Sequence, residues 1–126
     1  MSAELEHVNY TVSDPAATAA MLGRVFGWHI RWQGDSIHGG HSIHVGSKDR
    51  YVVVFSAGPG AEDKPRSYWT LSGLNHMGIV VDDLDATEAA VKAEGFEPNS
   101  HADYEPGRRF YFHDADGIEY EAVQYG

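Results

Sequence analysis

An internal repeat restricts the fold of this chain more than any other feature of its sequence. The segment that begins at His7, HVNYTVSD, aligns with the segment that begins at His76, HMGIVVDD, at an offset of 69 residues. Six of the fourteen positions from His7 to Ala20 are identical in the two copies. A repeat at a fixed offset indicates a duplicated structural unit. We therefore predict two similar modules in tandem.

Each copy opens with the pattern of a strand followed by a helix. Apolar residues alternate along both openings, with a period of two that is typical of a strand. These residues are Val8, Tyr10 and Val12 in the first copy and Met77, Ile79 and Val81 in the second. Asp14 and Asp83 follow, and a carboxylate at that position can cap a helix. Good helix formers then fill residues 16–25 and 86–93.

The remainder of each copy predicts three further strands. In the first copy they lie at 29–33, 41–45 and 51–56, and in the second at 98–102, 108–113 and 118–124, with a turn at Asp116-Gly117. The fold class is therefore α+β, with two βαβββ modules. We expect module one at 1–57, a Gly- and Pro-containing linker at 58–69 and module two at 70–126, with the sheets curving around a central cleft.

Composition excludes several classes of function. The 126 residues suit a single domain of ordinary size. A formal charge of −10 disfavours binding to phosphate backbones, so we expect no nucleic-acid partner. No cysteine is present, so a metal would need imidazole, carboxylate or carbonyl ligands. Neither a secretory signal nor a membrane-spanning stretch is recognisable, and we expect a cytoplasmic protein without a membrane partner.

Three residues form the strongest candidate site: His7, His76 and Glu121. The two histidines occupy the same place in the two repeats, on the strand face opposite the apolar stripe. Glu121 lies in the last expected strand, whereas Glu119 is nearer the turn and is expected to be solvated. Two imidazoles and one carboxylate form a recurrent set of ligands for divalent metals. The alternative is that each histidine has only a structural role, as an ordinary packed residue.

The sequence resembles the vicinal oxygen chelate superfamily over essentially its whole length. The resemblance rests on HVNYTV from His7, HMGIVVDD from His76 and FHDADGIEYE from Phe112 to Glu121. That superfamily includes glyoxalase I, bleomycin-resistance proteins, fosfomycin-resistance transferases, methylmalonyl-CoA epimerase and extradiol dioxygenases. The resemblance implies paired βαβββ modules and one divalent metal, Fe, Mn, Zn, Ni or Co, held by the three candidate ligands.

One departure from the family pattern concerns the fourth ligand. Glyoxalase I and the epimerase take a Glu or Gln from the last strand of the first module. The repeat aligns Val53 with Glu121, and no residue from Tyr51 to Phe55 carries a carboxylate or an amide side chain. The remaining His-His-Glu set resembles the extradiol dioxygenases and fosfomycin-resistance transferases, and it argues against ordinary glyoxalase I activity.

Other residues are weaker candidates. His44, the last histidine of the run His38, His41 and His44, and Tyr111 are candidate catalytic residues. Arg108, Arg109 and Tyr104 are candidate substrate-binding residues, and a salt bridge is the alternative for the arginines. The three tryptophans, Trp28, Trp32 and Trp69, are expected in the core or in the wall of the cleft.

Two functions follow from these observations. The first is a metal-dependent enzyme, a lyase, isomerase, transferase or extradiol-type dioxygenase, that binds a small substrate through adjacent oxygens. The second is a metal-free small-molecule binding protein of the bleomycin-resistance type, which would use aromatic walls and acidic charge. A homodimer is expected in either case.

Overall fold

The computed structural model describes residues 3–58, 61–62, 68–104 and 107–126 of the chain. The chain divides into two compact units, Met1–Glu62 and Asp63–Gly126. Most of the expected linker at 58–69 lies outside the described residues.

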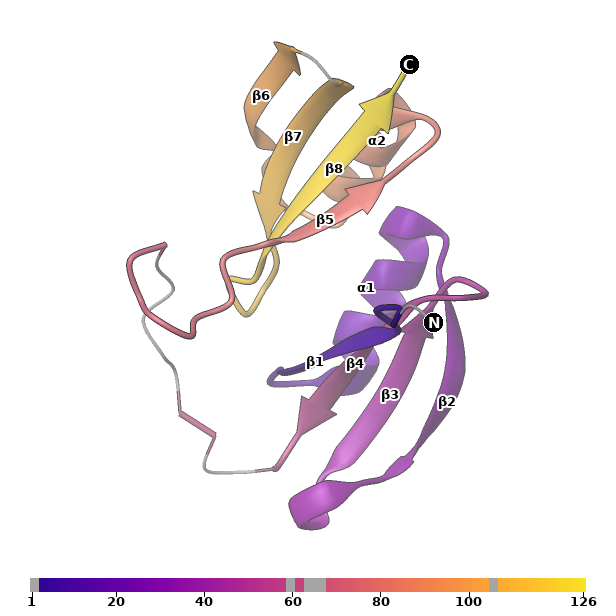
Figure 1. The fold of residues 1–126 in the computed structure, drawn as a ribbon, viewed down its shortest axis with the longest axis vertical. Helices are drawn as coiled ribbons and strands as arrows, with labels where there is room; N and C mark the ends of the chain where they lie inside the picture. Colours follow the sequence, from indigo (N-terminus) through magenta and orange to yellow (C-terminus); the bar gives the residue numbers. More distant parts are fainter. Residues whose placement is uncertain (1–2, 59–60, 63–67, 105–106) are drawn as a thin grey trace. The chain divides into compact units, whose positions relative to one another are not determined.

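The first unit is a four-stranded sheet with one helix packed against it (Figure 1). Its elements are β1 (His7–Thr11), α1 (Pro15–Phe26), β2 (His29–Asp35), the 3-10 turn η1 (Ile37–Gly39), β3 (His41–Gly46) and β4 (Tyr51–Ser56). The strand order is β1-β4-β3-β2. β1 runs parallel to β4, and the two other pairs are antiparallel.

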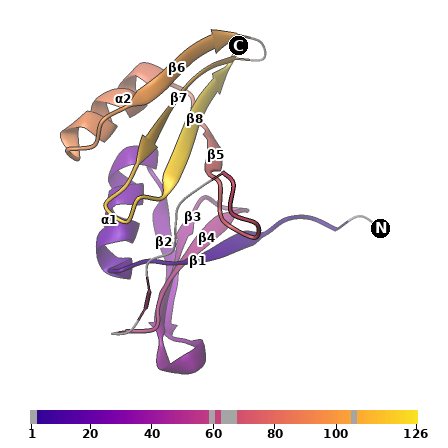
Figure 2. The ribbon, with the colours of Figure 1, turned by 90° about the vertical axis from the view of Figure 1, so that its left-hand side faces the viewer.

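The second unit repeats this arrangement. Its elements are β5 (Met77–Val80), α2 (Leu84–Ala93), β6 (Asn99–Tyr104), β7 (Gly107–His113) and β8 (Glu119–Tyr125). The strand order is β5-β8-β7-β6, with β5 parallel to β8. Figure 2 shows α2 lying along one side of its sheet. The predicted α+β class and the tandem βαβββ modules are confirmed.

The N-terminal caps of both helices lie where the sequence predicts. The Asp14 side chain accepts a hydrogen bond from the Ala17 N–H at 3.1 Å, and the Asp83 side chain accepts one from the Ala86 N–H at 3.0 Å. Each bond satisfies a first-turn donor that has no partner within the helix. α1 ends at Phe26 and is capped by Gly27, whose φ of 72° is in the left-handed region that glycine adopts without strain. α1 and α2 have 12 and 10 residues, and no helix in the described chain is long and apolar enough to cross a membrane.

The apolar face of each sheet packs on the helix of its own unit and forms the core. In the first unit the buried residues include Tyr10, Leu22, Ile43, Val45 and Val54, and in the second Val91, Phe110, Phe112, Tyr120 and Ala122. The alternation in each opening strand therefore assigned the helix side correctly. His7 lies on the opposite face of the first sheet, and Glu121 lies on the opposite face of the second.

A bulge in β2 is a feature that the sequence pattern did not predict. Ile30 pairs with Val45, and Trp32 pairs with His44, so Arg31 is an extra residue between two adjacent pairs. Directly paired residues share a sheet face, so the bulge moves Trp32 to the face of His44.

Among the tryptophans, Trp32 is 49% exposed and Trp69 is 90% exposed. The expectation of a core position is therefore wrong for both Trp32 and Trp69.

Candidate metal centre

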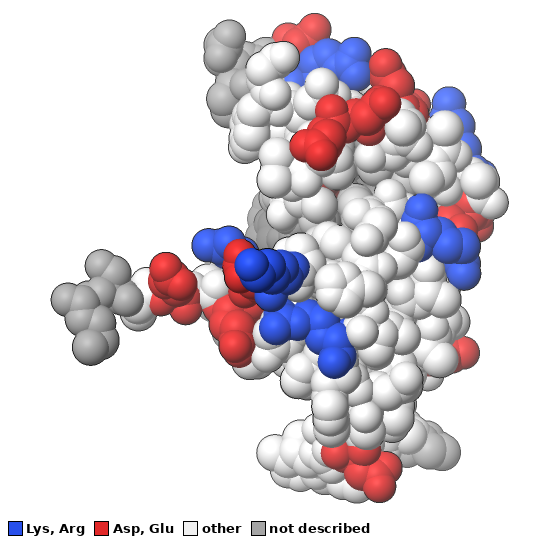
Figure 3. Space-filling view, turned by 90° about the vertical axis from the view of Figure 1, so that its right-hand side faces the viewer, with Lys and Arg blue, Asp and Glu red and all other residues white. Residues whose placement is uncertain are grey.

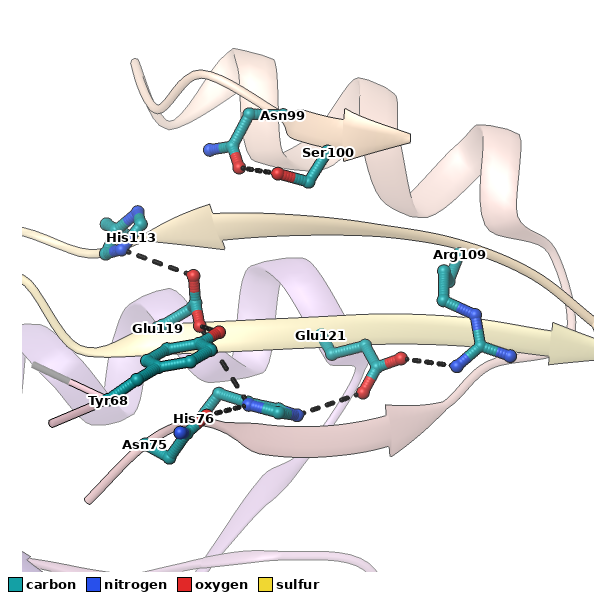
Figure 4. Close-up of polar contacts among 9 residues, drawn as sticks. All are labelled: Tyr68, Asn75, His76, Asn99, Ser100, Arg109, His113, Glu119 and Glu121. Carbon is teal, nitrogen blue, oxygen red and sulfur yellow. Dashed lines mark hydrogen bonds and ion pairs between the residues drawn. The ribbon is translucent and has the colours of Figure 1, made fainter. Parts of the chain in front are cut away.

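In the second unit the fold brings two of the three candidate ligands together. His76 immediately precedes β5 rather than lying within it, and Glu121 lies in β8. His76 Nε2 is 3.2 Å from Glu121 Oε1 (Figure 4). The Glu121 residue is 8% exposed. A nearly buried carboxylate needs a charged or hydrogen-bonding partner, or a metal.

The distance between these two atoms fits a shared metal. Two ligand atoms that each lie about 2.1 Å from a metal, at right angles, are about 3.0 Å apart, and at a tetrahedral angle about 3.4 Å. The observed 3.2 Å between His76 Nε2 and Glu121 Oε1 falls between these values. The pair therefore fits as two neighbouring ligands of one divalent ion.

The other oxygen of Glu121 is held by Arg109. Arg109 Nη1 donates to Glu121 Oε2 at 2.8 Å, and the two side chains are 13% and 11% exposed. Because Arg109 binds Oε2, only Oε1 is directed toward His76 (Figure 4). Arg108 projects elsewhere and forms an exposed ion pair with Asp85 of α2 at 3.0 Å. The structure therefore does not bring the two arginines together as one anion clamp.

Glu119 is part of the same group of side chains, contrary to the expectation that it is solvated. Its side chain is 14% exposed and lies 3.5 Å from His113 Nε2 and 3.9 Å from His76 Nδ1. Tyr68 also donates a hydrogen bond to Glu119, and this bond raises the pKa of Tyr68 to about 12. A shallow pocket adjoins these residues. The sequence feature that could have identified Glu119 is its two-residue spacing from Glu121, because this spacing places both carboxylates on one sheet face.

The turn before β8 is fixed by Asp114, a buried carboxylate. Asp114 Oδ1 accepts from the N–H groups of Asp116 and Ile118, each at 2.9 Å, and Oδ2 accepts from the Tyr120 hydroxyl at 2.9 Å. Burial raises the pKa of Asp114, although these hydrogen bonds act in the opposite direction. The FHDADG segment that carries the family resemblance thus holds the start of the strand that bears Glu121.

In the first unit His7 stands at the start of β1 with two neighbours. His7 Nδ1 is 2.8 Å from Glu6 Oε1, and the His7 ring stacks on Tyr51 with ring centres 5.1 Å apart. The Tyr51 hydroxyl donates to the same Glu6 oxygen at 3.0 Å. These hydrogen bonds from His7 and Tyr51 lower the pKa of Glu6. The lowered pKa leaves the Glu6 carboxylate ionised beside the His7 ring near pH 7.

His44 belongs to the same row of rings. Its ring stacks on Tyr51 at 4.9 Å and meets Trp32 edge-on at 5.0 Å. Arg31, the extra residue of the β2 bulge, places its guanidinium 4.3 Å above the Tyr51 ring. Burial lowers the pKa of His44, and the positive charges of His7 and Arg31 lower it further. This half-buried imidazole is therefore neutral near pH 7.

The register of the two sheets identifies the residue that stands in place of a fourth ligand. Gly78 pairs with Glu121 in the second unit, and its repeat counterpart Asn9 pairs with Val53 in the first. Val53 is therefore the counterpart of Glu121, as expected, at a separation of 68 residues that is one less than the offset of the opening segments. It is 3% exposed, and an aliphatic side chain cannot bind a metal.

Among the remaining candidate residues, Tyr111 lies beside both Glu121 and His76. Tyr111 pairs with Glu121 across the β-sheet and meets His76 edge-on at 5.5 Å. His38 lies in η1 with a left-handed φ of 61°, and His41 begins β3. The side chain of Tyr104 lies outside what the structure describes. Within the described residues no group of three or more His, Asp or Glu side chains is assembled that could hold a metal.

Charge around the site is set by individual contacts rather than by the net charge of −10. On the face in Figure 3, acidic and basic side chains lie in mixed groups. At the candidate centre itself, Arg109 compensates one carboxylate, Glu121, at 2.8 Å. The local balance of charge is therefore compatible with either a cation or an anionic ligand group.

Comparison with known proteins identifies the family. The model of the Glyoxalase/Bleomycin resistance protein/Dioxygenase superfamily matches residues 4–122. A glyoxylase/bleomycin resistance protein/dioxygenase domain from Frankia sp. EAN1pec has a similar structure, with a TM-score of 0.83, 22% identity and full coverage of both chains. Comparison with curated protein sequences finds no match.

Two fosfomycin resistance proteins also share the fold. The FosX protein from Listeria monocytogenes, solved with Mn(II) and a sulfate ion, has a TM-score of 0.76 and 20% identity, and the match covers 100% of this chain and 95% of that one. FosX from Mesorhizobium loti has a TM-score of 0.74 and 24% identity, with coverage of 98% and 92%. The chain described here belongs to the Glyoxalase/Bleomycin resistance protein/Dioxygenase superfamily.

Proposed function

We propose that the protein is a metal-dependent enzyme that binds a small oxygenated substrate at a centre formed by His7, His76 and Glu121. The observation that carries the proposal is the 3.2 Å separation of His76 Nε2 and Glu121 Oε1, which suits two ligands of one ion. His7 is included because it occupies the place of His76 in the first repeat.

The donor set limits the metal to a few divalent ions. Imidazole nitrogen and carboxylate oxygen suit Fe(II), Mn(II), Zn(II), Ni(II) and Co(II). Mn(II) is the first ion to test, because the similar FosX from Listeria monocytogenes was solved with it. When bound, such an ion supplies Lewis-acid stabilisation of negative charge that develops on substrate oxygens.

Two side chains are proposed to act on the substrate itself. His44 and Tyr111 hold equivalent places in the two sheets, since His44 pairs with Val53 and Tyr111 pairs with Glu121. The neutral His44 can accept a proton, and the Tyr111 hydroxyl can donate a hydrogen bond to an oxygen. Arg108 and Arg109 both lie in ion pairs, the alternative expected for them from the sequence. Roles of these arginines and of Tyr104 in substrate binding stay predictions.

One observation favours the second candidate function, a metal-free binding protein. The 2.8 Å ion pair between Arg109 and Glu121 already neutralises the carboxylate, as a cleft without a metal would require. The half-exposed Trp32 offers an aromatic surface for a ligand in that case. The cytoplasmic location and the homodimer are proposals under both functions.

The proposal is tested by replacing His7, the candidate ligand from the first repeat. We expect His7→Ala to weaken Mn(II) binding by more than the roughly 10–100-fold that loss of an outer-shell partner causes, because a direct ligand is removed. Electron paramagnetic resonance of titrated Mn(II) measures the free and bound ion. His41→Ala is the matched control and should bind as the unaltered protein does. Equal affinity in His7→Ala would exclude His7 from the centre.

A further inference from the structure

The bulge in β2 brings two neighbouring side chains to the face of the first sheet that carries His7. Arg31, the extra residue, has its Cζ atom 4.3 Å from the centre of the Tyr51 ring. Trp32, the next residue, meets the His44 ring edge-on at 5.0 Å. In a regular strand, neighbouring side chains point to opposite faces, and a bulge interrupts this alternation. A cation and an indole therefore occupy the same face.

The Trp32 indole offers a flat aromatic surface on this face. A Cβ atom added to Gly34 would lie 2.9 Å from Cζ2 and 3.0 Å from Cη2 of the Trp32 ring. The indole therefore leans along β2 over a residue that has no side chain. Trp32 is nevertheless 49% exposed. An exposed indole in this position can stack with a flat ring of a ligand.

The Arg31 guanidinium is available to an anionic group. Arg31 is exposed, and among the described residues no carboxylate forms an ion pair with it, although the charge of Glu6 interacts with it. The contact with the Tyr51 ring requires no hydrogen-bond acceptor, so the N–H donors of the guanidinium remain for a ligand. A guanidinium can bind a carboxylate through two parallel hydrogen bonds. Charge and geometry at Arg31 therefore favour a carboxylate.

We propose that Arg31 and Trp32 determine substrate specificity and select a small aromatic carboxylate, whose ring stacks on Trp32 and whose carboxylate pairs with Arg31. The inference rests on the proposed function, because the Tyr51 ring beneath the guanidinium also stacks on His7, with ring centres 5.1 Å apart. The carboxylate end of the ligand therefore lies on the side of the proposed metal centre, and the ring lies at Trp32.

Three probe molecules test the two parts of the proposal separately. Benzoate has both a planar ring and a negative charge, benzamide lacks the charge, and cyclohexanecarboxylate lacks the planar ring. Titrations of the metal-free protein are followed by NMR of the backbone amides of β3. We expect benzoate to bind about 10–100-fold more tightly than benzamide, because charged hydrogen bonds form. We expect it to bind about 2–10-fold more tightly than cyclohexanecarboxylate, because aromatic rings stack.

Variants assign each preference to one residue. Arg31→Met should remove the preference for benzoate over benzamide, and Trp32→Leu should remove the preference for benzoate over cyclohexanecarboxylate. Arg50→Met and Trp69→Leu are matched controls, because they replace exposed residues of the same two types, and they should keep both preferences. Circular dichroism verifies that each variant is folded.

The outcomes for the proposal and for the metal centre are distinguishable. Equal affinity for the three probes, or a preference that survives in its own variant, would overturn the inference, and the metal centre would stand because its test uses Mn(II) alone. Selective benzoate binding by a protein that binds no Mn(II) would overturn the assignment of the aromatic carboxylate as the substrate of a metal-dependent enzyme, together with the proposed function.

Discussion

Replacing Glu121 with Gln is expected to abolish tight metal binding. The substitution preserves the size of the side chain but removes the negative charge that faces His76 Nε2 at 3.2 Å. An amide oxygen is a weaker donor to a divalent ion than a carboxylate oxygen, and the ion would lose the only charged ligand of the proposed set. Calorimetric titration with Mn(II) should show an affinity loss greater than the roughly 100-fold upper range for outer-shell partners.

The controls for Glu121→Gln use two other glutamates. Glu97→Gln removes the same charge at an exposed position and should leave metal affinity unchanged. Glu119→Gln tests the neighbouring carboxylate, which contacts Tyr68 and His113. If Glu119→Gln loses metal binding and Glu121→Gln retains it, the metal ligand is Glu119 rather than Glu121. Circular dichroism verifies folding, because Arg109 loses its charged partner in the Glu121 variant.

The largest loss of stability is expected from Phe110→Ala in β7. Phe110 has 0% exposure, and its ring lies 6.5 Å from Phe112 in the core of the second unit. Truncating a fully buried Phe to Ala costs about 3–5 kcal/mol, because the transfer free energy is lost and a cavity remains. Urea unfolding followed by circular dichroism measures the change. A small chain has about 5–15 kcal/mol of total stability, so the variant should be partly unfolded at elevated temperature.

Tyr125→Ala is the matched control for this prediction. Tyr125 also lies in the second sheet, at the end of β8, but it is 55% exposed. Its truncation should change the unfolding free energy by less than about 1 kcal/mol, as is usual for exposed positions. A Phe110→Ala loss equally small would mean that the aromatic cluster is not the core of this unit.

The fold was largely predictable because the repeat carries the same information twice. Asp14 and Asp83 cap their helices as the pattern required, and the register confirms Val53 as the counterpart of Glu121. A period of two and a capping carboxylate are features of the local sequence, so they can be recognised without knowledge of the tertiary structure. The predicted ranges for β2 and β6 end two residues before the strands themselves end, because the last residues of each strand are polar and resemble loop sequence.

The candidate site was predictable only in part. Nothing in the sequence places an extra residue at Arg31, because a bulge depends on how β2 registers with β3. Glu119 was expected in solvent because of its place beside the turn, whereas Tyr68, far away in sequence, covers it. The contacts of Glu6 and Asn75 with the neighbouring histidines depend on rotamers, which a linear pattern does not specify.

The central claim is that this protein holds a divalent metal through a ligand set that includes His76. Elemental analysis by plasma mass spectrometry tests it most directly, on protein purified without an affinity tag or chelator, beside the His76→Ala variant. The account predicts about one transition-metal ion per chain in the unaltered protein and a marked loss in the variant. Absence of metal from both, even after reconstitution with each candidate ion, would contradict the account and favour the metal-free binding protein.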